Sequence, residues 1–368
     1  MEHSLKNGHS SRYGQLMSFD YPMHSEDSHS SPHEEICSSC GLLLDVTDEV
    51  LFALVKCPRC RAEVHVRRRF GAYELTGILG QGGSSTVFRA HLVDSRAEGG
   101  ASGAEVALKV IEKRDAEFGE ALLLLKHEAN HARFLDHPKI VKTLGLLENE
   151  TGAGLVMELM EGGSLHDLIL SGNPISEERL LQIGLEILKA LKAASSKDII
   201  HHDLKPANIL FTASGVAKLG DFGLARSSME ESPPELHLMA TPDYVAPEIL
   251  SGQAGDFRSD LYGLGGCLYH AFTGHSPYQS DGLQREDLAL LKRRAVRKDL
   301  LSSDLLMETR KIILKLLDSD PEKRFQSHEA LEFAFCKALD HRERRKGTHG
   351  RLRQVVESFR QEIFQLVD

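Results

Sequence analysis

Apolar and polar positions divide the middle of the chain into two stretches with different periodicities. From 73 to 147, short apolar runs alternate with glycine-containing turns, a pattern typical of β-strands joined by tight connections. Within that stretch, 115–135 carries apolar residues at helical spacing. We therefore expect a small sheet accompanied by one helix over this part of the chain.

The helical period dominates after a hinge-like segment at 154–163. A buried helix is predicted by six apolar residues, Leu180, Ile183, Leu185, Ile187, Leu188 and Leu191. The run Ser176-Glu-Glu-Arg just before them is typical of a capping box at a helix start. No internal repeat is apparent along the chain.

The segment 1–34 differs from this pattern. It is rich in Ser, His, Asn, Asp and Glu and poor in aliphatic residues, so it buries too little apolar surface to offset the entropy of ordering. A metal site is an alternative, because five histidines occur there, His3, His9, His24, His29 and His33. Their irregular spacing favours a disordered tail.

The segment 341–368 begins with the basic run R-E-R-R-K-G and then becomes amphipathic. A helix with one apolar stripe is predicted by residues at steps of three or four, Leu352, Val355, Val356, Phe359, Ile363, Phe364 and Val367. Three uses of that stripe are open: packing back on the domain, self-association or partner binding, and contact with a membrane surface.

Composition fits a globular protein, because 41% of the 368 residues are apolar and 27% are charged. The formal charge is −10, with 54 acidic against 44 basic residues, so nothing attracts the whole chain to nucleic acid or to anionic membranes. The first residues lack the apolar core of a secretory signal, and no stretch approaches about 18 uninterrupted apolar residues. We expect a soluble, cytoplasmic protein without a transmembrane segment.

Four of the six cysteines form two Cys-x-x-Cys pairs, Cys37 with Cys40 and Cys57 with Cys60, separated by sixteen residues. This spacing suits tetrahedral Zn²⁺ and predicts a zinc-ribbon-like module over 35–68, with buried strands at 42–46 and 50–55. Redox or disulfide use and an iron site are the alternatives. A docking or structural role is favoured over nucleic-acid binding, because basic and aromatic residues are not interleaved around the arginines at 67–69.

Two features in the β-rich stretch point to phosphate chemistry. The run L-G-Q-G-G-S-S-T-V at 79–87 lies between two strand patterns, and its glycines allow main-chain N–H groups to approach an anion. The run V-A-L-K ends at Lys109, and a buried ammonium there needs a counter-charge such as Glu128, nineteen residues later. Each feature alone also fits an ordinary hairpin and a solvent-facing lysine.

The order of the motifs decides between these alternatives. H-H-D-L-K-P-A-N at 201–208 and D-F-G at 221–223 follow the two features above. Over 73–338 the ordered set resembles the protein kinase family, in particular bacterial eukaryotic-like Ser/Thr kinases. The resemblance implies an α+β, two-lobed fold, with a small β-rich lobe at 73–157 and a large helical lobe at 161–338, preceded by the zinc-ribbon-like module.

The resemblance implies transfer of the γ-phosphoryl group of ATP, with Mg²⁺ or Mn²⁺, to Ser and Thr hydroxyls of protein substrates in signalling. It assigns catalysis to Asp203, Lys205, Asn208, Asp221 and Thr241, with Asn208 and Asp221 as the magnesium ligands. It assigns nucleotide binding to Leu79, Gly80, Gln81, Gly82, Gly83, Ser84, Ser85, Thr86, Val87, Ala107, Lys109, Glu128, Met157 and Leu210.

The large lobe carries further matches. The resemblance implies a structural ion pair between Glu248 of A-P-E and Arg324 of D-P-E-K-R-F. It also implies that Asp260 anchors the main chain of the catalytic loop. A pseudokinase scaffold and a zinc-ribbon nucleic-acid-binding regulator are the alternative functions. The active kinase is favoured because every residue of the catalytic set is present.

Three positions depart from the family pattern. Ser85 replaces the third glycine of the phosphate loop, and Ala240 stands where glycine usually precedes Thr-Pro. His202 stands where the family usually has arginine, which often binds a phosphate on the activation loop. Imidazole lacks the bidentate fork of arginine, so we predict an activation loop that does not depend on phosphorylation. Ser227, Ser228 and Ser232 remain candidate phosphorylation sites.

Overall fold

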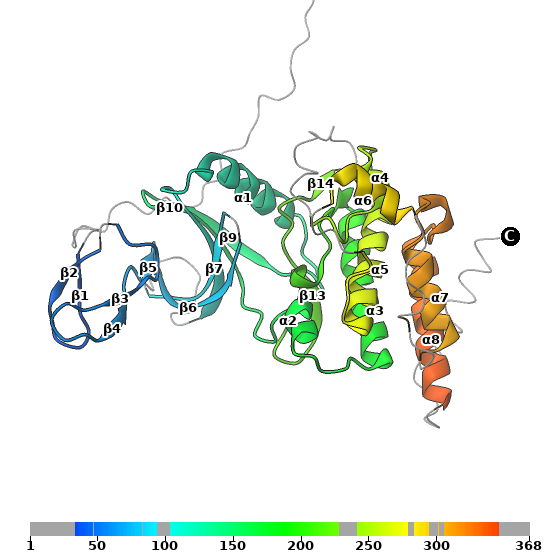
Figure 1. Ribbon diagram of the computed structural model, residues 1–368, viewed down its shortest axis with the longest axis horizontal. Coiled ribbons are helices and arrows are strands. Elements are labelled where there is room, and N and C mark those ends of the chain that lie inside the picture. Colours follow the sequence, from blue (N-terminus) through cyan, green and yellow to red (C-terminus); the bar gives the residue numbers. More distant parts are fainter. Residues whose placement is uncertain are drawn as a thin grey trace, which may run out of the picture. The chain divides into compact units, whose positions relative to one another are not determined.

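The computed structural model describes residues 34–46, 48–82, 84–93, 104–227, 241–278, 283–293, 301 and 305–345. They belong to two compact units, Met1–Arg67 and Arg68–Asp368, which we describe separately (Figure 1). Several sequence expectations fall on residues outside the described ranges. They concern the tail before Glu34, Gly83 of the phosphate loop, Ser228, Ser232, Ala240 and the amphipathic stripe beyond 345.

The first unit consists of two β-hairpins. β1 (Glu34–Ile36) pairs with β2 (Leu43–Asp45), and β3 (Leu54–Lys56) pairs with β4 (Glu63–His65). Each hairpin turns at a Cys-x-x-Cys pair, where the N–H of Cys37 donates to the carbonyl of Leu42 (2.7 Å) and that of Cys57 to Ala62 (2.9 Å). The unit is therefore an internal repeat, which sequence inspection missed because few residues besides the cysteines are shared.

The core of this unit is small and contains Leu44, Val46, Val64 and Val66 beside the cysteines. The expectation of buried strands at 42–46 and 50–55 is only partly right. Leu43 and Leu54 are more than half exposed, at 53% and 56%, because successive side chains of a strand point to opposite faces. The residues before Leu54 form a turn rather than a strand.

The small lobe of the second unit is one antiparallel sheet of six strands, in the order β5-β6-β7-β8-β10-β9. The strands are β5 (Arg69–Phe70), β6 (Tyr73–Gln81), β7 (Thr86–Leu92), β8 (Glu105–Glu112), β9 (Thr143–Glu148) and β10 (Gly152–Glu158). The sheet begins at β5, before the expected boundary at Tyr73. Phe70 of β5 is buried, and its ring packs so closely on Gly154 of β10 that a Cβ at Gly154 would come within 2.8 Å of the ring.

One helix, α1 (Phe118–Ala132), packs on this sheet, slightly shorter than the expected 115–135. Ala121 and Leu125 contact Ile111 of β8 and Leu155 of β10 in a common apolar cluster. This packing fixes the face of α1 that carries Glu128, which is buried with them. The sheet and α1 together confirm the expected β-rich lobe.

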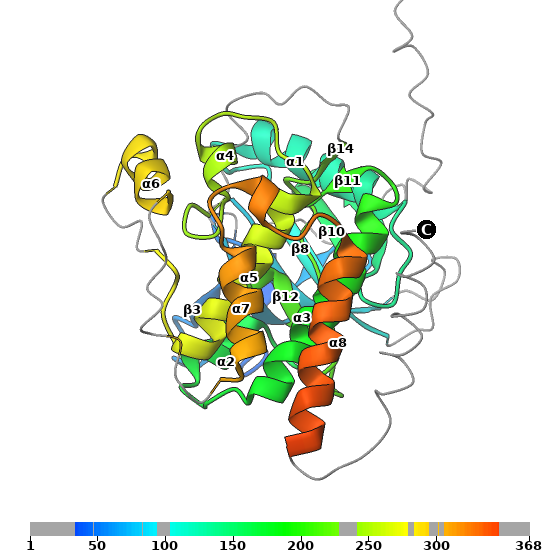
Figure 2. The same cartoon turned by 90° about the vertical axis from the view of Figure 1, so that its right-hand side faces the viewer.

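The large lobe is helical, as expected. Its helices are α2 (Leu165–Leu170), α3 (Glu177–Ser195), α4 (Pro247–Leu250), α5 (Phe257–Thr273), α6 (Arg285–Lys292), α7 (Met307–Leu316) and α8 (His328–Arg345). Figure 2 shows α3, α5, α7 and α8 packed beside one another. Gly184 makes the close approach of α3 possible, because a Cβ there would come within 2.7 Å of the Phe335 ring and 3.3 Å of Leu268.

Short elements connect these helices. They are β11 (Ile199–Ile200), the 3-10 turn η1 (Pro206–Asn208), β12 (Ile209–Phe211), β13 (Ala217–Leu219), β14 (Arg226–Ser227) and η4 (Pro321–Lys323). β12 pairs with β13 and β11 pairs with β14, so the two motifs at 201–208 and 221–223 lie next to each other. Among the described residues no helix has the length and apolarity that a membrane span requires.

Helix capping differs from expectation. Ser176 does accept from the N–H of Arg179, but an arginine at this position cannot complete a reciprocal capping box. The complete box lies at the start of α2, where Ser164 and Asp167 each bind the main-chain N–H of the other. Ser176 therefore caps the start of α3 through its own side chain, without the reciprocal bond of a capping box.

The ion pair between Glu248 and Arg324 is confirmed. Two guanidinium nitrogens of Arg324 lie 2.7 and 2.8 Å from the two carboxylate oxygens of Glu248, and the Arg324 side chain has no exposed surface. Arg324 also donates to the carbonyl of Asp318 (2.8 Å). The pair ties α4 to the segment after α7, and a buried bidentate pair of this kind strongly fixes the geometry of both partners.

Candidate active site

Lys109 lies on β8 and uses its ammonium to join three elements. Its Nζ is 2.8 Å from Glu128 Oε2 on α1 and 2.9 Å from Asp221 Oδ1 in the D-F-G segment. The side chain of Glu128 is only 4% exposed, whereas that of Asp221 is 40% exposed. The structure thus brings together the lysine and the two carboxylates that the sequence assigned to phosphate and metal binding.

Charge interactions in this cluster shift each group. Burial disfavours the charge of Lys109, but the carboxylates of Asp221 and Glu128 outweigh it and raise the pKa of Lys109. Burial raises the pKa of Glu128 to about 7, although Lys109 acts in the opposite direction. Burial also acts against ionised Asp221, but Lys109 dominates and lowers the pKa of Asp221 to about 2. Asp221 is therefore a carboxylate at neutral pH.

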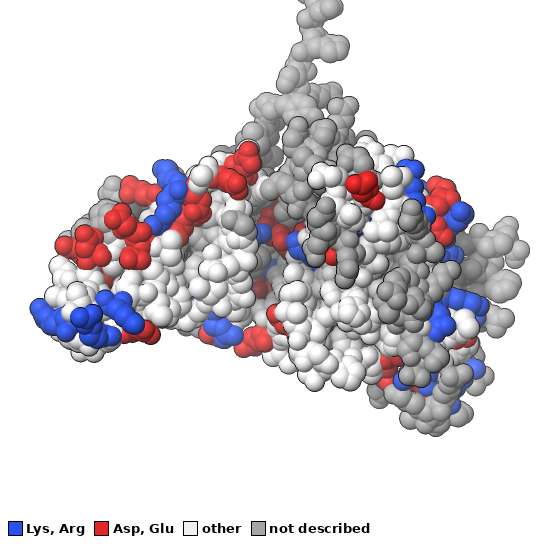
Figure 3. Space-filling model, viewed as in Figure 1, with Lys and Arg blue, Asp and Glu red and all other residues white. Residues whose placement is uncertain are grey.

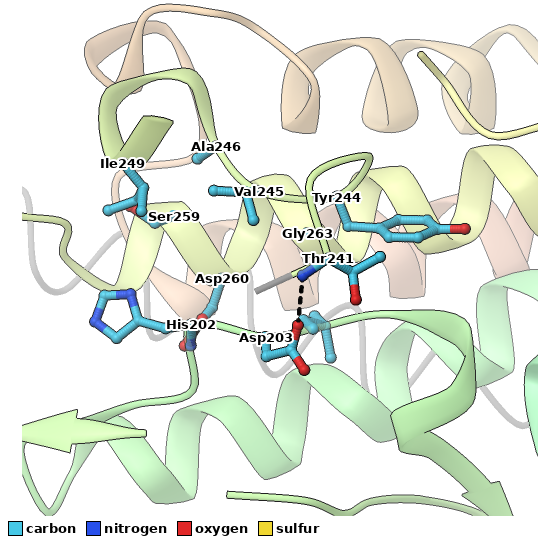
Figure 4. Close-up of a pocket in the computed structure, with 11 residues that line it drawn as sticks. His202, Asp203, Thr241, Tyr244, Val245, Ala246, Ile249, Ser259, Asp260 and Gly263 are labelled. Carbon is cyan, nitrogen blue, oxygen red and sulfur yellow. Dashed lines mark hydrogen bonds between the residues drawn. The ribbon is translucent and has the colours of Figure 1, made fainter. Parts of the chain in front are cut away.

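The loop that follows β11 is held by a buried carboxylate. Asp260 on α5 accepts the main-chain N–H of His201 (2.8 Å) and that of His202 (2.9 Å), as the resemblance implied. These bonds hold His202 at a φ of +62°, in the left-handed region where histidine occurs more readily than most residues. Asp203, the next residue, is thereby placed in a fixed orientation (Figure 4).

Asp203 is buried and its carboxylate meets three donors. Oδ2 accepts from Lys205 Nζ (2.6 Å) and from Asn208 Nδ2 (3.3 Å). Oδ1 accepts from the main-chain N–H of Thr241 (3.1 Å), the dashed contact in Figure 4. Thr241 therefore reaches Asp203 through its main-chain N–H, a group that the sequence motif did not single out.

A cavity of about 160 Å³ separates these groups, several times the roughly 30 Å³ share of one water. Its polar lining consists of Ser84, Ser85, Lys109, Glu128, Asp203 and Asp221. The expected nucleotide-binding residues Leu79, Ala107, Met157 and Leu210 do not line this cavity. Ala107 and Met157 are direct cross-strand partners on β8 and β10.

The phosphate loop lies over this cavity through strand register. Val87 pairs with Gly80 across the hairpin and with Lys109 on the other side, so the hairpin tip and the lysine share one end of the sheet. Gly82 closes the tip by donating to the carbonyl of Ser85 (2.8 Å). A Cβ on Gly80 would meet nothing within 4 Å, so the surrounding fold does not require that glycine. Gly83 lies outside the described residues.

Comparison with known proteins agrees with this geometry. The protein kinase domain family matches residues 73–336. The chain belongs to the protein kinase family. Over the part of the surface that Figure 3 draws in colour, both acidic and basic side chains occur, and most of the visible surface of the lobes carries neither.

Curated relatives of this chain come from several bacteria. The probable serine/threonine-protein kinase SCO3848 of Streptomyces coelicolor is 32% identical over 281 residues, 74% of this chain and 41% of the relative. The serine/threonine-protein kinase PknB of Mycobacterium leprae is 32% identical over 261 residues, 69% and 41% of the two chains. The probable kinase CPE1738 of Clostridium perfringens is 30% identical over 256 residues, 69% and 36%. The chain spans about two fifths of the length of these relatives.

The four cysteines of the first unit form a second cluster. All four sulfurs lie within 4.8 Å of one another, with Cys37 and Cys60 at 3.8 Å and Cys40 and Cys57 at 3.6 Å. These distances exclude disulfides, whose sulfurs are about 2.05 Å apart. They match the roughly 3.8 Å expected between sulfurs that are each about 2.3 Å from one tetrahedral zinc ion.

Main-chain donors favour thiolates at the second Cys-x-x-Cys pair. The N–H of Ala62 is the main cause that lowers the pKa of Cys60 to about 6. The N–H of Cys60 acts in the same way and lowers the pKa of Cys57. At Cys40 the N–H of Leu42 acts in the same direction, but burial and the neighbouring thiols outweigh it and raise the pKa of Cys40 to about 12. Thiolates are the form that binds metal, so the second hairpin is prepared for a cation.

Glu128 gives a test of the charge cluster that needs no ligand. Its pKa is about 7 in the folded chain against an ordinary 4.5, so the folded state holds an extra proton between these values. The stability that Glu128 contributes relative to Glu128→Gln should therefore fall as pH rises from 4.5 to 7, by about 1 to 3 kcal/mol. Urea denaturation at both pH values measures it.

The control is Glu120→Gln, which changes an exposed acid on the same helix. Its free energy of unfolding relative to the parent should not depend on pH in this range. A Glu128→Gln difference that is equal at pH 4.5 and 7 would contradict the raised pKa of Glu128.

Proposed function

We propose that this chain is an ATP-dependent serine/threonine protein kinase that transfers the γ-phosphoryl group of ATP to protein Ser and Thr hydroxyls in signalling. The observation that carries the proposal is the position of Asp203. Three donors fix its carboxylate on the wall of a cavity that Lys109, Glu128 and Asp221 also line. Family membership and the printed names of the relatives support the same activity.

Each residue has a role that follows from its chemistry. Lys109 binds the α and β phosphates, and Glu128 fixes the direction of its ammonium. Asp203 accepts a hydrogen bond from the substrate hydroxyl and takes up its proton, while Lys205 lies beside the γ-phosphate. Since phosphoryl transfer depends on positioning and on neutralising spread charge, this set supplies most of what the protein must provide.

Asp221 and Asn208 fit the magnesium role. Asn208 Nδ2 donates to the main-chain carbonyl of Asp203 (2.9 Å), and none of the described residues donates to its amide oxygen. A carboxylate oxygen and an amide oxygen are ligands that Mg²⁺ prefers. The bound ion would neutralise phosphate charge. Leu79, Ala107, Met157 and Leu210 would contact the adenine from the sheet and β12.

Asp203→Asn tests the proposed base. The substitution keeps the shape of the side chain but cannot accept the proton, so kcat for transfer from labelled ATP to a Ser/Thr protein substrate should fall by about 10²- to 10⁴-fold. The control is Asp198→Asn, an exposed residue at a φ of +58° where asparagine is also tolerated.

The control should keep the parent's activity. A parent that binds ATP without transferring phosphate would instead favour the pseudokinase scaffold. Retention of full activity by Asp203→Asn would contradict the assigned base.

We also propose that activity does not depend on activation-loop phosphorylation. The imidazole of His202 points away from the Asp203 carboxylate in Figure 4. The imidazole lies close to the backbone at Gly255, because a Cβ added to Gly255 would come within 3.3 Å of His202 Cε1. A side chain placed in this way offers a phosphate at most one donor, whereas arginine offers a bidentate fork.

Replacing Ser227, Ser228 and Ser232 together by alanine tests this independence. Of these three serines, the structure describes only Ser227, and of Ser227 only the backbone. Because position 202 carries histidine and not an arginine that could bind a loop phosphate through two donors, the triple variant should keep the parent's kcat and KM within roughly twofold. Loss of most activity in the triple variant would show that a phosphate on this loop is needed.

For the first unit we propose a structural Zn²⁺ held by Cys37, Cys40, Cys57 and Cys60, with a docking or structural role beside the kinase. The matched sulfur distances and the two lowered thiol pKa values support it. The ion would cross-link two hairpins whose apolar core is small. Self-association through 341–368, the cytoplasmic location and the exclusion of nucleic acid as a partner remain predictions from the sequence.

Metal analysis of the full chain tests the zinc site. The parent should hold about one equivalent of zinc, and Cys57→Ser should lose most of it because three sulfurs bind zinc far less tightly than four. Cys336→Ser, at a buried cysteine of α8, is the matched control and should keep the parent's content. A parent with less than about half an equivalent would contradict a structural zinc ion.

A further inference from the structure

The last residue of α6, Lys292, is a fully buried lysine whose ammonium is saturated by one short loop. Its Nζ donates to the carbonyls of Pro242 (2.7 Å), Asp243 (2.8 Å) and Val245 (2.7 Å). The residue has no exposed surface. An ammonium has three protons and no acceptor, so these contacts use its whole hydrogen-bonding capacity.

The surroundings of Lys292 show why the charge is tolerated. The ring centroids of Tyr262 and Tyr278 each lie 5.5 Å from Nζ, close enough for a cation–π contribution. Burial lowers the pKa of Lys292 to about 7, while the carboxylates of Asp243 and Glu248 act in the opposite direction. Tyr278 also donates its hydroxyl hydrogen to the carbonyl of Lys292 (3.4 Å).

Apolar packing alone would be served better by leucine or methionine at this position. Burying a lysine costs free energy unless partners satisfy its charge and its donors. Here every partner of the ammonium is a main-chain carbonyl of the segment between Thr241 and Ala246, which we call the 241–246 loop. The lysine therefore specifies the conformation of this loop rather than the packing of α6.

The 241–246 loop connects Lys292 to the reacting groups. Thr241 precedes Pro242, the first residue whose carbonyl accepts from Lys292, and it donates its N–H to Asp203 Oδ1 (3.1 Å). Farther along, the Tyr244 hydroxyl and His270 Nδ1 on α5 are 2.6 Å apart. Figure 4 shows the loop passing above Asp203. The main-chain nitrogen of Thr241 is directed at the Asp203 carboxylate, and the Tyr244 side chain is directed away from it.

We propose that Lys292 is a positioning residue for phosphoryl transfer, which holds the 241–246 loop so that its start orients Asp203, the group proposed to bind the acceptor hydroxyl. The inference rests on the proposed kinase function. Lys292 does not line the cavity beside Lys109, so its effect should fall on the acceptor side of the reaction and not on ATP.

Lys292→Met tests the proposal, because methionine fills a similar volume and removes all three donors. Steady-state kinetics with a Ser/Thr peptide should show kcat lower by about tenfold or more and peptide KM higher by roughly fivefold, since the loop and the Asp203 carboxylate lose their fixed geometry. The KM for ATP should stay within about twofold of the parent. Thermal unfolding establishes that the variant is folded.

The matched control is Arg293→Met, the same change at the exposed neighbouring residue, which should leave all three parameters unchanged. Lys292→Gln, which keeps two donors, should lie between the parent and Lys292→Met. A parent without transfer activity would overturn the proposed kinase function itself.

Two results would overturn the role of Lys292 in an active parent. One is a folded Lys292→Met with the parent's kcat and peptide KM, or with ATP KM changed by the same factor as peptide KM. The other is failure of both Lys292 variants to fold, which would show that the ammonium holds the lobe together and not the loop in particular.

Discussion

The ammonium of Lys109 joins the parts of the site that come from different regions of the chain. It binds Glu128 on α1 and Asp221 in the D-F-G segment at 2.8 and 2.9 Å, so one charge links the sheet, the helix and the large lobe. Burial raises the pKa of Glu128 to about 7, so Asp221 is the partner of Lys109 that is fully ionised at neutral pH.

Besides the side-chain pair of Glu248 and Arg324, several buried charges in the large lobe hold backbone segments in place. Asp260 accepts two N–H groups of the catalytic loop, and Lys292 donates to three carbonyls of the 241–246 loop. Glu177 at the start of α3 likewise accepts the N–H of Leu306 (3.0 Å). Because a buried charge is costly unless all of its partners stay in place, each one favours a single loop conformation.

Motif order singled out most of the polar residues that the structure brings together around the cavity, because Lys109, Asp203, Asn208 and Asp221 are recognisable by type and spacing. Lys292 was not predicted, since its three partners are main-chain carbonyls that leave no mark in the sequence. Thr241 was assigned to the site by its motif alone, and the structure adds that its main-chain N–H contacts Asp203.

The zinc-ribbon-like unit shows a different limit. Cysteine spacing predicted the cluster, but apolar runs suggested buried strands where the hairpins expose every second residue. Two short hairpins have only one covered face, so apolar content there does not measure burial. The repeat of the hairpin was hidden for the same reason, because exposed positions are free to differ.

The binding of ATP and of adenosine to Lys109→Met tests the central role of Lys109 most directly. Isothermal titration of both ligands in Mg²⁺ separates phosphate contacts from base contacts. Since a charge-assisted hydrogen bond to phosphate is lost, ATP affinity should fall by about tenfold or more while adenosine affinity changes by less than about twofold. Equal losses for the two ligands, or no loss for ATP, would contradict the account.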